Sequence, residues 1–307
     1  MKRLLVLTLI LAGLIAAGIG GYYIWQYYSE TVSNEPKPPD NNNGGTTPPE
    51  TTGVPVSKFK LVTDAALRAS FDKGWAPPQF QENWVSADWS PDSSQVVYLE
   101  TVGGKTNLGL FTPSNLKSQA LASLTLRDTT VTWLNSNEII ISDKPSKAVR
   151  GSVWKYKIKE KIFEPVITEE LGPWIQWDKN FNGGIKFSTS QGGTSPPTKL
   201  EASIIDNTGK VVKMLPFITF PDKCVFENAL VFCAVPNRIL SGANLPDDYL
   251  KGSLVLSDAF FSFNIKTGAV EFLVDSEGSI NATRLKKIGN KLLFMNHYDD
   301  KLYEMRL

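Results

Sequence analysis

Short apolar runs rich in β-branched and aromatic residues recur along the chain after residue 57. Typical runs are 95–99 (QVVYL), 138–142 (EIIIS) and 185–188 (IKFS), and each follows a turn rich in Asn, Ser, Pro or Gly. Such runs predict β-strands, because these side chains pack well on a pleated sheet and the flanking residues favour turns. We therefore expect an all-β domain over residues 58–307.

Tryptophan marks a repeat within this domain. Three tryptophans lie 44 residues apart, at Trp89, Trp133 and Trp177. After each one comes a turn, a strand and then a second hairpin, so one repeat contains four strands. This period and strand content are those of a β-propeller blade, and we expect the three indoles to fill equivalent gaps between blades. A β-sandwich with coincidental Trp spacing is the alternative.

The pattern continues with a looser period through a fourth unit and a fifth that lacks one strand. The fifth unit begins at 283–288 (TRLKKI) and ends with 301–307 (KLYEMRL). Residues 58–63 (KFKLVT) precede the first blade and supply a suitable outer strand. Pairing of the two ends would remove an open sheet edge. The sequence thus predicts a five-bladed β-propeller of four-stranded blades, with six blades as the alternative.

The N-terminal region predicts a membrane anchor. Residues 4–28 contain no charged side chain, follow Lys2 and Arg3, and end in a cluster of Tyr and Trp. A helix of this length spans a bilayer, the aromatic residues suit its interface, and the positive residues favour a cytoplasmic N-terminus. We expect residues 1–28 to form a single-pass transmembrane helix that places the propeller outside the cell membrane. A cleaved signal peptide is the alternative.

Residues 29–57 contain six prolines, a triple Asn and few large apolar side chains, so they predict a disordered tether. The whole chain has 32 Lys and Arg residues against 31 Asp and Glu residues, which provides no basic field for nucleic acid. One His and two Cys residues cannot complete a four-ligand zinc site. We therefore predict no metal, no cofactor and no nucleic-acid partner.

Cys224 and Cys233 flank a predicted hairpin. If Asn228 and Ala229 form a two-residue loop, the cysteines face each other at a non-hydrogen-bonded pair, within disulfide reach. A three-residue loop would shift the register and leave two buried thiols. We expect a structural disulfide outside the cytoplasm.

The segment 87–98 (ADWSPDSSQVVY) resembles the signature of WD40-like repeats in TolB-type periplasmic propellers, with Ser93 where that signature has Gly. The anchor, tether and propeller together also resemble uncharacterised membrane-anchored propeller proteins of candidate-phylum bacteria. These resemblances imply an envelope protein and supply no catalytic residue.

Two connections are longer than the others, 64–83 before blade one and 236–258 within blade four. Because strand direction alternates, both open on the same face of the propeller. They carry mixed aromatic and charged residues typical of a recognition surface, although a cap over the ring is the alternative. Besides Phe71, the candidate partner-binding residues are Trp75, Phe80, Arg238, Asp247, Asp248, Tyr249 and Lys251.

We therefore predict a non-enzymatic module that binds a protein or cell-wall glycan through this loop-bearing face. An envelope glycosidase or lyase that uses propeller carboxylates such as Asp247 and Asp248 is one alternative, because paired carboxylates perform such chemistry. A structural subunit of a surface complex is another. No G-x-S-x-G nucleophile motif occurs in the chain.

Overall fold

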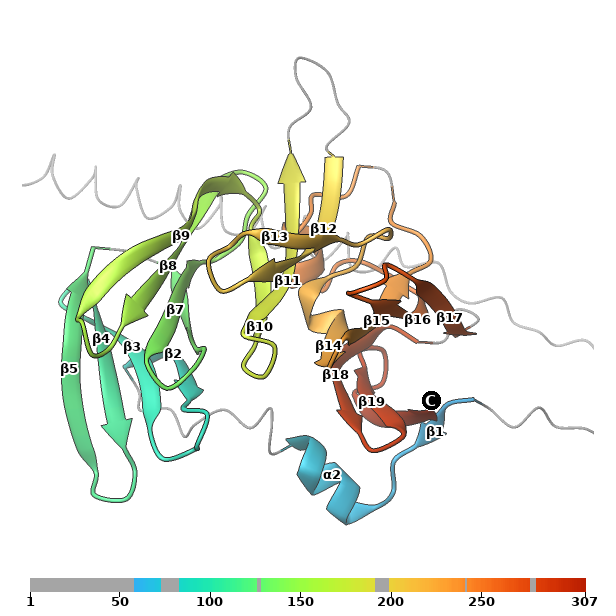
Figure 1. The fold of residues 1–307 in the computed structure, drawn as a ribbon, viewed down its shortest axis with the longest axis horizontal. Helices are drawn as coiled ribbons and strands as arrows, with labels where there is room; N and C mark the ends of the chain where they lie inside the picture. The colour runs from blue at the N-terminus through green and yellow to red at the C-terminus, as the bar shows by residue number, and fades with distance from the viewer. Residues whose placement is uncertain (1–57, 73–82, 126–127, 191–198, 241, 277–279) are drawn as a thin grey trace, which may run out of the picture. The chain divides into compact units, whose positions relative to one another are not determined.

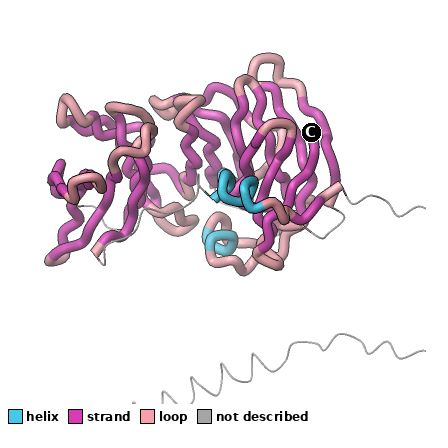
Figure 2. The backbone as a smooth tube through the Cα atoms, turned by 90° about the horizontal axis from the view of Figure 1, so that it is seen from below, coloured by secondary structure: helices cyan, strands magenta, loops and turns pink. Residues whose placement is uncertain are grey.

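The computed structural model describes residues 58–72, 83–125, 128–190, 199–240, 242–276 and 280–307. The predicted anchor and tether lie outside these residues. Within the described part of the chain, no helix is long and apolar enough to cross a membrane. Residues from Val56 to Leu307 form one structural unit, and strands make up most of its described backbone (Figure 2).

Five four-stranded antiparallel sheets build this unit, as the sequence predicts, and they follow one another in chain order (Figure 1). Blade one contains β2 (Trp84–Trp89), β3 (Val96–Val102), β4 (Lys105–Thr112) and β5 (Lys117–Leu124). Blade two contains β6 (Thr129–Trp133), β7 (Glu138–Asp143), β8 (Arg150–Lys157) and β9 (Ile162–Leu171). Blade three contains β10 (Trp174–Asp178), β11 (Gly183–Ser190), β12 (Lys199–Asp206) and β13 (Val211–Met214).

A short 3-10 helix, η1 (Pro221–Lys223), leads into blade four. That blade contains β14 (Cys224–Glu227), β15 (Leu230–Pro236), β16 (Asp258–Asn264) and β17 (Val270–Asp275), with helix α3 (Asp247–Leu250) in its long connection. Blade five contains β18 (Ala282–Ile288), β19 (Lys291–Asn296), β20 (Lys301–Arg306) and β1 (Lys60–Leu61). The prediction of five four-stranded blades is confirmed, and their arrangement is consistent with a β-propeller.

Successive blades pack face to face through alternating side chains. In β15, Val231 and Cys233 belong to the core shared with blade three, whereas Phe232 and Ala234 belong to the core shared with blade five. This alternation follows from the two-residue period of a strand. Trp133 lies in the core between blades one and two, and Trp177 in the core between blades two and three. Both fill gaps between blades, as the 44-residue period predicts. Trp89 does not, because it packs against a cluster made of blade one residues alone, around Trp84 and Tyr98, so the prediction was wrong for the first indole of the series.

The first blade is tied to its neighbours by the residues of its signature. Asp88 accepts a hydrogen bond from the backbone N–H of Trp133 at 2.8 Å and lies 3.2 Å from the ammonium of Lys179 in blade three. Ser93 adopts a left-handed backbone with φ of 59°. That conformation is the one for which glycine is favoured, which explains why the TolB-type signature has Gly at this position.

Residues 65–72 differ from the expected recognition loop, because they form helix α2 (Ala65–Asp72). The carboxylate of Asp64 accepts hydrogen bonds from the N–H groups of Ala66 and Leu67, which caps the helix. Leu67 and Phe71 lie four residues apart, on one face, and pack against blade five. Phe71 is only 1% exposed, so its assignment to a recognition surface was wrong.

The outer strand of blade five comes from the N-terminal side of the propeller, as predicted. Lys60 pairs with Glu304 and Leu61 with Tyr303. The N–H of Val62 donates to the carbonyl of Leu302 at 2.9 Å, and the Val62 side chain packs in the core beneath helix α2. This segment therefore joins blade five through backbone pairing with β20 and through the buried side chain of Val62.

We expect Val62→Ala to lower the free energy of unfolding by roughly 1 to 3 kcal/mol, because it removes buried methyl groups from a packed site. Leu61→Ala is the matched control: Leu61 is 42% exposed against 8% for Val62, so its truncation should change stability by less than about 0.5 kcal/mol. Urea unfolding of both variants measures the difference. Equal effects would show that the closing strand contributes no core packing.

Cys224 and Cys233 form a disulfide, with their Cα atoms 4.2 Å apart. Glu227 pairs with Leu230, so the hairpin has the two-residue loop on which this prediction depended. Asn228, at the first position of that loop, has φ of 55°, which Asn tolerates better than most residues.

Replacement of both cysteines with Ser should lower the melting temperature, and the chain-entropy model limits the loss to roughly 2 to 3 kcal/mol because the closed loop is short. Reduction of the wild-type protein should produce a comparable loss, whereas the double variant should not respond to reductant. Quantitative alkylation of wild-type thiols without reductant would contradict the disulfide.

Candidate functional site

The long connection of blade four folds over its neighbours as a cap, which we define as residues 237–240 and 242–257. Leu245 and Leu256 are buried in a cluster with Phe187 and Phe220 from below the cap. Tyr249 stacks on Phe220 with ring centroids 3.9 Å apart. The cap is therefore anchored by apolar packing of its own and does not stand free of the sheets.

Polar contacts tie the cap to three blades. The Asp247 carboxylate accepts hydrogen bonds from the Ser146 hydroxyl at 3.0 Å and from the Lys147 N–H at 2.7 Å, both in the β7–β8 loop of blade two. From blade five, the Tyr298 hydroxyl donates to the carbonyl of Leu256. At the start of blade four, the Tyr249 hydroxyl donates to the Asp222 carboxylate at 2.9 Å. The alternative that this insertion caps the ring is thus the geometry observed.

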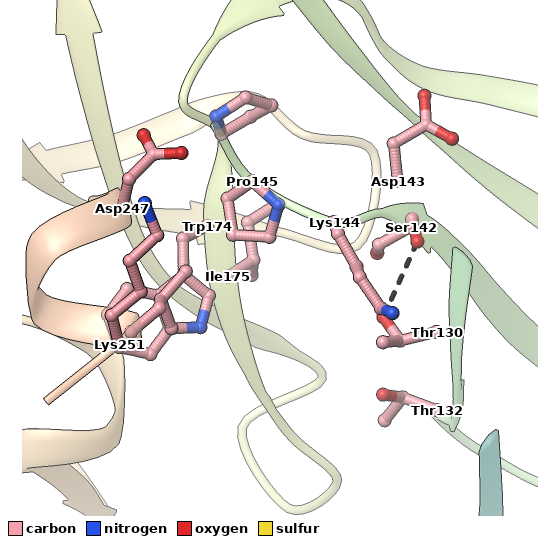
Figure 3. Close-up of a pocket in the computed structure, with 12 residues that line it drawn as sticks. Thr130, Thr132, Ser142, Asp143, Lys144, Pro145, Trp174, Ile175, Asp247 and Lys251 are labelled. Carbon is pink, nitrogen blue, oxygen red and sulfur yellow. Dashed lines mark hydrogen bonds between the residues drawn. The ribbon is translucent and has the colours of Figure 1, made fainter. Parts of the chain in front are cut away.

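A cavity of about 420 Å³ opens between blade two, blade three and the cap (Figure 3). Its wall on blade two consists of residues from β6, from the end of β7 and from the loop that follows, namely Thr130, Thr132, Ser142, Asp143, Lys144 and Pro145. Its wall on blade three includes Trp174 and Ile175 of β10. The cap contributes Asp247, Leu250 and Lys251. In Figure 3 the two threonine side chains lie across the cavity from Trp174 and Ile175. One wall therefore carries hydroxyl groups and the other an aromatic and aliphatic surface.

The charged groups around this cavity differ in how strongly other groups of the protein already engage them. Both oxygens of Asp247 already accept hydrogen bonds, and Asp143 accepts one from the Ser152 N–H at 2.9 Å. Lys144 and Lys251 are exposed, and Lys144 lies 3.7 Å from Asp128 in a pair whose side chains are 62% and 85% exposed. Such exposed ion pairs contribute little to stability. The ammonium groups are therefore the more accessible charges.

A second hollow of about 410 Å³ adjoins the first and shares Asp247 and Lys251 with it. Lys147 and Asn244 also line this hollow, with the Lys147 ammonium 3.2 Å from the Asn244 amide oxygen. Asp248 lines it too, and its carboxylate accepts a hydrogen bond from the Asn244 N–H at 2.6 Å. The two hollows thus lie next to each other along one side of the cap.

Beneath the cap lies a buried ionic cluster. The Lys223 ammonium donates to the Asp258 carboxylate, the Asn281 side-chain oxygen and the Ala282 carbonyl, each at 2.7 Å. Lys223 and Asp258 are both 0% exposed. Removal from water raises the pKa of Asp258, although the attraction of Lys223 opposes the shift. The cluster joins η1 to blades four and five, and its residues line neither of the two hollows described above.

Asp222 lies next to this cluster. Burial raises the pKa of its carboxyl to about 6, against the opposing effects of the Lys223 charge and the Tyr249 hydrogen bond. Burial and the neighbouring Asp222 carboxylate raise the pKa of the Tyr249 hydroxyl well above its usual value. Tyr249 therefore acts as a hydrogen-bond donor on the underside of the cap.

The structure brings four of the predicted partner-binding residues together. Asp247, Asp248 and Tyr249 lie in helix α3, and Lys251 follows it. Asp247 and Lys251 line both hollows, whereas the Tyr249 ring and hydroxyl are engaged inside the cap. Arg238 is exposed near the start of the cap. The two remaining predicted residues, Trp75 and Phe80, lie outside the described part of the chain.

Sequence reasoning missed the cavity residues contributed by blades two and three. Lys144 follows a strand end, and Thr130, Thr132 and Trp174 lie on strands whose pattern indicates only core and edge positions. Their approach to the cap depends on the placement of three separate blades. The only signal available was that the β7–β8 loop opens on the same face as the cap.

No protein-family model matches the sequence, and no curated protein matches it significantly. Among solved structures, an oligogalacturonate lyase from Vibrio parahaemolyticus matches with a TM-score of 0.52 and 10% identity, over 74% of this chain and 67% of the lyase chain. An oligogalacturonate lyase in complex with manganese matches with a TM-score of 0.50 and 11% identity, over 75% and 67%. TolB from Acinetobacter baumannii matches with a TM-score of 0.42 and 13% identity, over 73% and 54%.

These matches concern the fold alone. The chain spans about half the length of the TolB chain. The β-propeller architecture agrees with the five sheets described above, and a fold shared with a lyase does not assign its reaction. The resemblance to membrane-anchored propellers of candidate-phylum bacteria stays a prediction.

We expect the contribution of Asp222 to stability to fall as the pH rises from about 4 to about 6. In this range the folded carboxyl, with a pKa of about 6, holds a proton that the unfolded carboxyl has released, so the native state binds more protons. The difference in unfolding free energy between wild type and Asp222→Asn should therefore change with pH, by at most about 3 kcal/mol. Urea titrations at several pH values measure this difference. A difference independent of pH would place the Asp222 pKa in its ordinary range.

Proposed function

We propose that this protein is a non-catalytic binding module of the cell envelope, and that its cap face captures a protein or cell-wall partner. One observation supports this proposal most strongly. The acidic side chains of the cap are used to build it, because Asp247 and Asp248 accept hydrogen bonds from loop backbone and hydroxyl groups. The accessible groups of the adjoining cavity are instead hydroxyls, an indole and two lysines, which suit recognition.

The carboxylates near the cap give little support to the alternative of a glycosidase or lyase. General acid and base catalysis on a glycosidic bond uses two carboxyl groups that converge on one site. Asp143 and Asp247 both line the cavity, but each already accepts hydrogen bonds from blade two. Asp222 and Asp258 face Tyr249 and Lys223 in the interior. Among the described residues, no group of three or more His, Cys, Asp or Glu side chains could hold a metal ion.

The proposed cellular location rests on the sequence. Residues 4–28 form the anchor, Lys2 and Arg3 hold the N-terminus in the cytoplasm, and residues 29–57 connect the anchor to an extracytoplasmic propeller. A disulfide between Cys224 and Cys233 is compatible with that location, because disulfides persist in oxidising compartments.

Site-specific photo-crosslinking of the full-length protein in its own cells tests the binding face. A photoreactive residue in place of Lys251 reports on the cap, and one in place of Lys266 is the matched control, because Lys266 is an exposed lysine in the turn at the opposite end of β16. We expect a light-dependent adduct from position 251 at a yield at least several times that from position 266. Equal yields, no adduct at position 251, or chemical conversion of the captured molecule would contradict the proposal.

A further inference from the structure

We propose that the face of the propeller opposite the cap binds the surface of an anionic phospholipid bilayer. This inference rests on the proposed function, in which residues 4–28 anchor the protein, and it adds a second binding face to that of the cap. The surface consists of the turns that join the third and fourth strands of blades one to four, at residues 113–116, 158–161, 207–210 and 265–269. We call these the rim turns.

The rim turns lie at one end of neighbouring blades. Because antiparallel strands alternate in direction, these turns open on the face opposite the β7–β8 loop and the cap. In the second rim turn, Ile158 packs against the core shared with blade one. The third approaches blade two, where the Lys155 ammonium lies 3.4 Å from the Asn207 carbonyl oxygen. In the fourth, Gly268 lies against the Lys213 side chain of blade three.

Large apolar side chains are exposed at each rim turn. Four of the six form consecutive pairs at the starts of β9 and β13. Consecutive residues of a strand point to opposite faces of the sheet, so apolar surface meets solvent on both sides of these strands. Packing between blades therefore does not account for all six residues, which are Leu116, Ile162, Phe163, Val211, Val212 and Val270.

Leu116 is the most exposed of the six, at 80%. Its backbone has φ of 55°, in the left-handed region, which favours Gly or Asn over a bulky apolar residue. Neither core packing nor backbone preference thus explains a leucine at this position. Insertion at the boundary between lipid headgroups and acyl chains would give the side chain an apolar environment.

The rim turns also carry a net positive charge. Together with the residue that follows each turn, they contain five lysines and one acidic residue, Glu160. None of these lysines forms an ion pair with another described residue. Lysines beside exposed apolar side chains are typical of surfaces that bind anionic lipid headgroups. The five are Lys117, Lys159, Lys161, Lys210 and Lys266.

The acidic residues at this end of the blades are engaged within the protein. Three form ion pairs with lysines of the blades. Three accept hydrogen bonds from N–H groups of their own turns, and two accept hydrogen bonds from neighbouring side chains. In that order they are Glu138, Glu227 and Glu304, then Asp92, Asp178 and Asp206, then Glu160 and Glu271.

The position of the N-terminal strand agrees with a bilayer on this side. Lys60 pairs with Glu304 of β20, and β20 ends beside the turn at 289–290. Strand β1 therefore begins at the same face as the rim turns, with Lys58 and Lys60 exposed. The proposed anchor precedes β1 in the chain and would hold this face near the bilayer, where weak contacts become effective.

The test is a fluorescence measurement on the full-length protein reconstituted into vesicles, either of phosphatidylcholine alone or of an equal mixture with phosphatidylglycerol. An environment-sensitive label on Leu116→Cys reports on the rim turns. The same label on Val255→Cys is the matched control, because Val255 lies on the cap and is 81% exposed. The native cysteines are bonded to each other and do not take the label.

We expect the emission at position 116 to rise at least twofold in the anionic vesicles only, because the label enters an apolar environment. The rise should shrink between 50 and 300 mM salt, since salt screens contacts between ammonium groups and phosphate. The label at position 255 should not distinguish the two kinds of vesicle.

Charge variants of the labelled protein locate the surface. Lys161→Gln with Lys210→Gln should lower the response at position 116 by at least half. Lys105→Gln with Lys301→Gln removes the same charge from the opposite face and should leave the response unchanged. Comparable melting temperatures show that the fold is kept in each variant.

Equal emission at position 116 in both kinds of vesicle, an equal response at position 255, or a full response in the Lys161 and Lys210 variant would overturn this inference. Flotation separates these outcomes from failure of the anchor. If the protein floats with both kinds of vesicle and position 116 does not respond, the anchor stands and the rim turns do not bind lipid. If it floats with anionic vesicles alone, the anchor fails and the rim surface stands.

Neither result depends on whether position 251 crosslinks to a partner in cells. A lipid adduct at position 266, which lies in the fourth rim turn, differs in mass from the protein or glycan adducts that the crosslinking comparison counts.

Discussion

Each sheet of this propeller has two apolar faces, and both must be covered. Four seams are formed by neighbouring blades, whose alternating side chains interdigitate in shared cores. At the end of the series, helix α2 covers the second face of blade five, while the second face of blade one carries its own cluster around Trp84 and Tyr98. The described part of the insertion before blade one therefore serves to pack against blade five. Without it, the apolar side chains around Leu293 and Leu302 would be exposed to water.

A related constraint, the need to satisfy buried polar groups, applies beneath the cap. Lys223 is fully buried at the entrance to blade four, and three acceptors from blades four and five surround its ammonium. Loss of Asp258 would leave the Lys223 charge unpaired in a medium of low dielectric constant. Tyr249 lies over the same region, with its ring centroid 5.7 Å from the Lys223 ammonium. The cap therefore shields this cluster and at the same time forms one wall of the cavity.

The sequence predicts those features that depend on local pattern. The places of Trp133 and Trp177 follow from the 44-residue period, the disulfide from the two-residue turn of its hairpin, and the donor strand near Lys60 from the strand that the fifth unit lacks. Trp89 shares the period but packs within blade one, because no blade lies against that face in the described core. The cavity was beyond reach because its walls come from separate blades, and no spacing relates Thr132 to Lys251. Phe71 was misassigned because the sequence of a long connection does not show whether an aromatic side chain in it faces solvent or packs against a sheet.

Pairing of β1 with β20 also constrains the order of folding. Lys60 and Glu304 are neighbours in the sheet, although almost the whole propeller separates them along the chain. Blades one to four are built from contiguous segments and can form as synthesis proceeds, whereas blade five must wait until β20 is made. Until then the 58–63 segment presents an unpaired strand, and β19 lacks its neighbour β20. This early segment therefore waits longest for its partner, and throughout that time its open edge can pair with another chain.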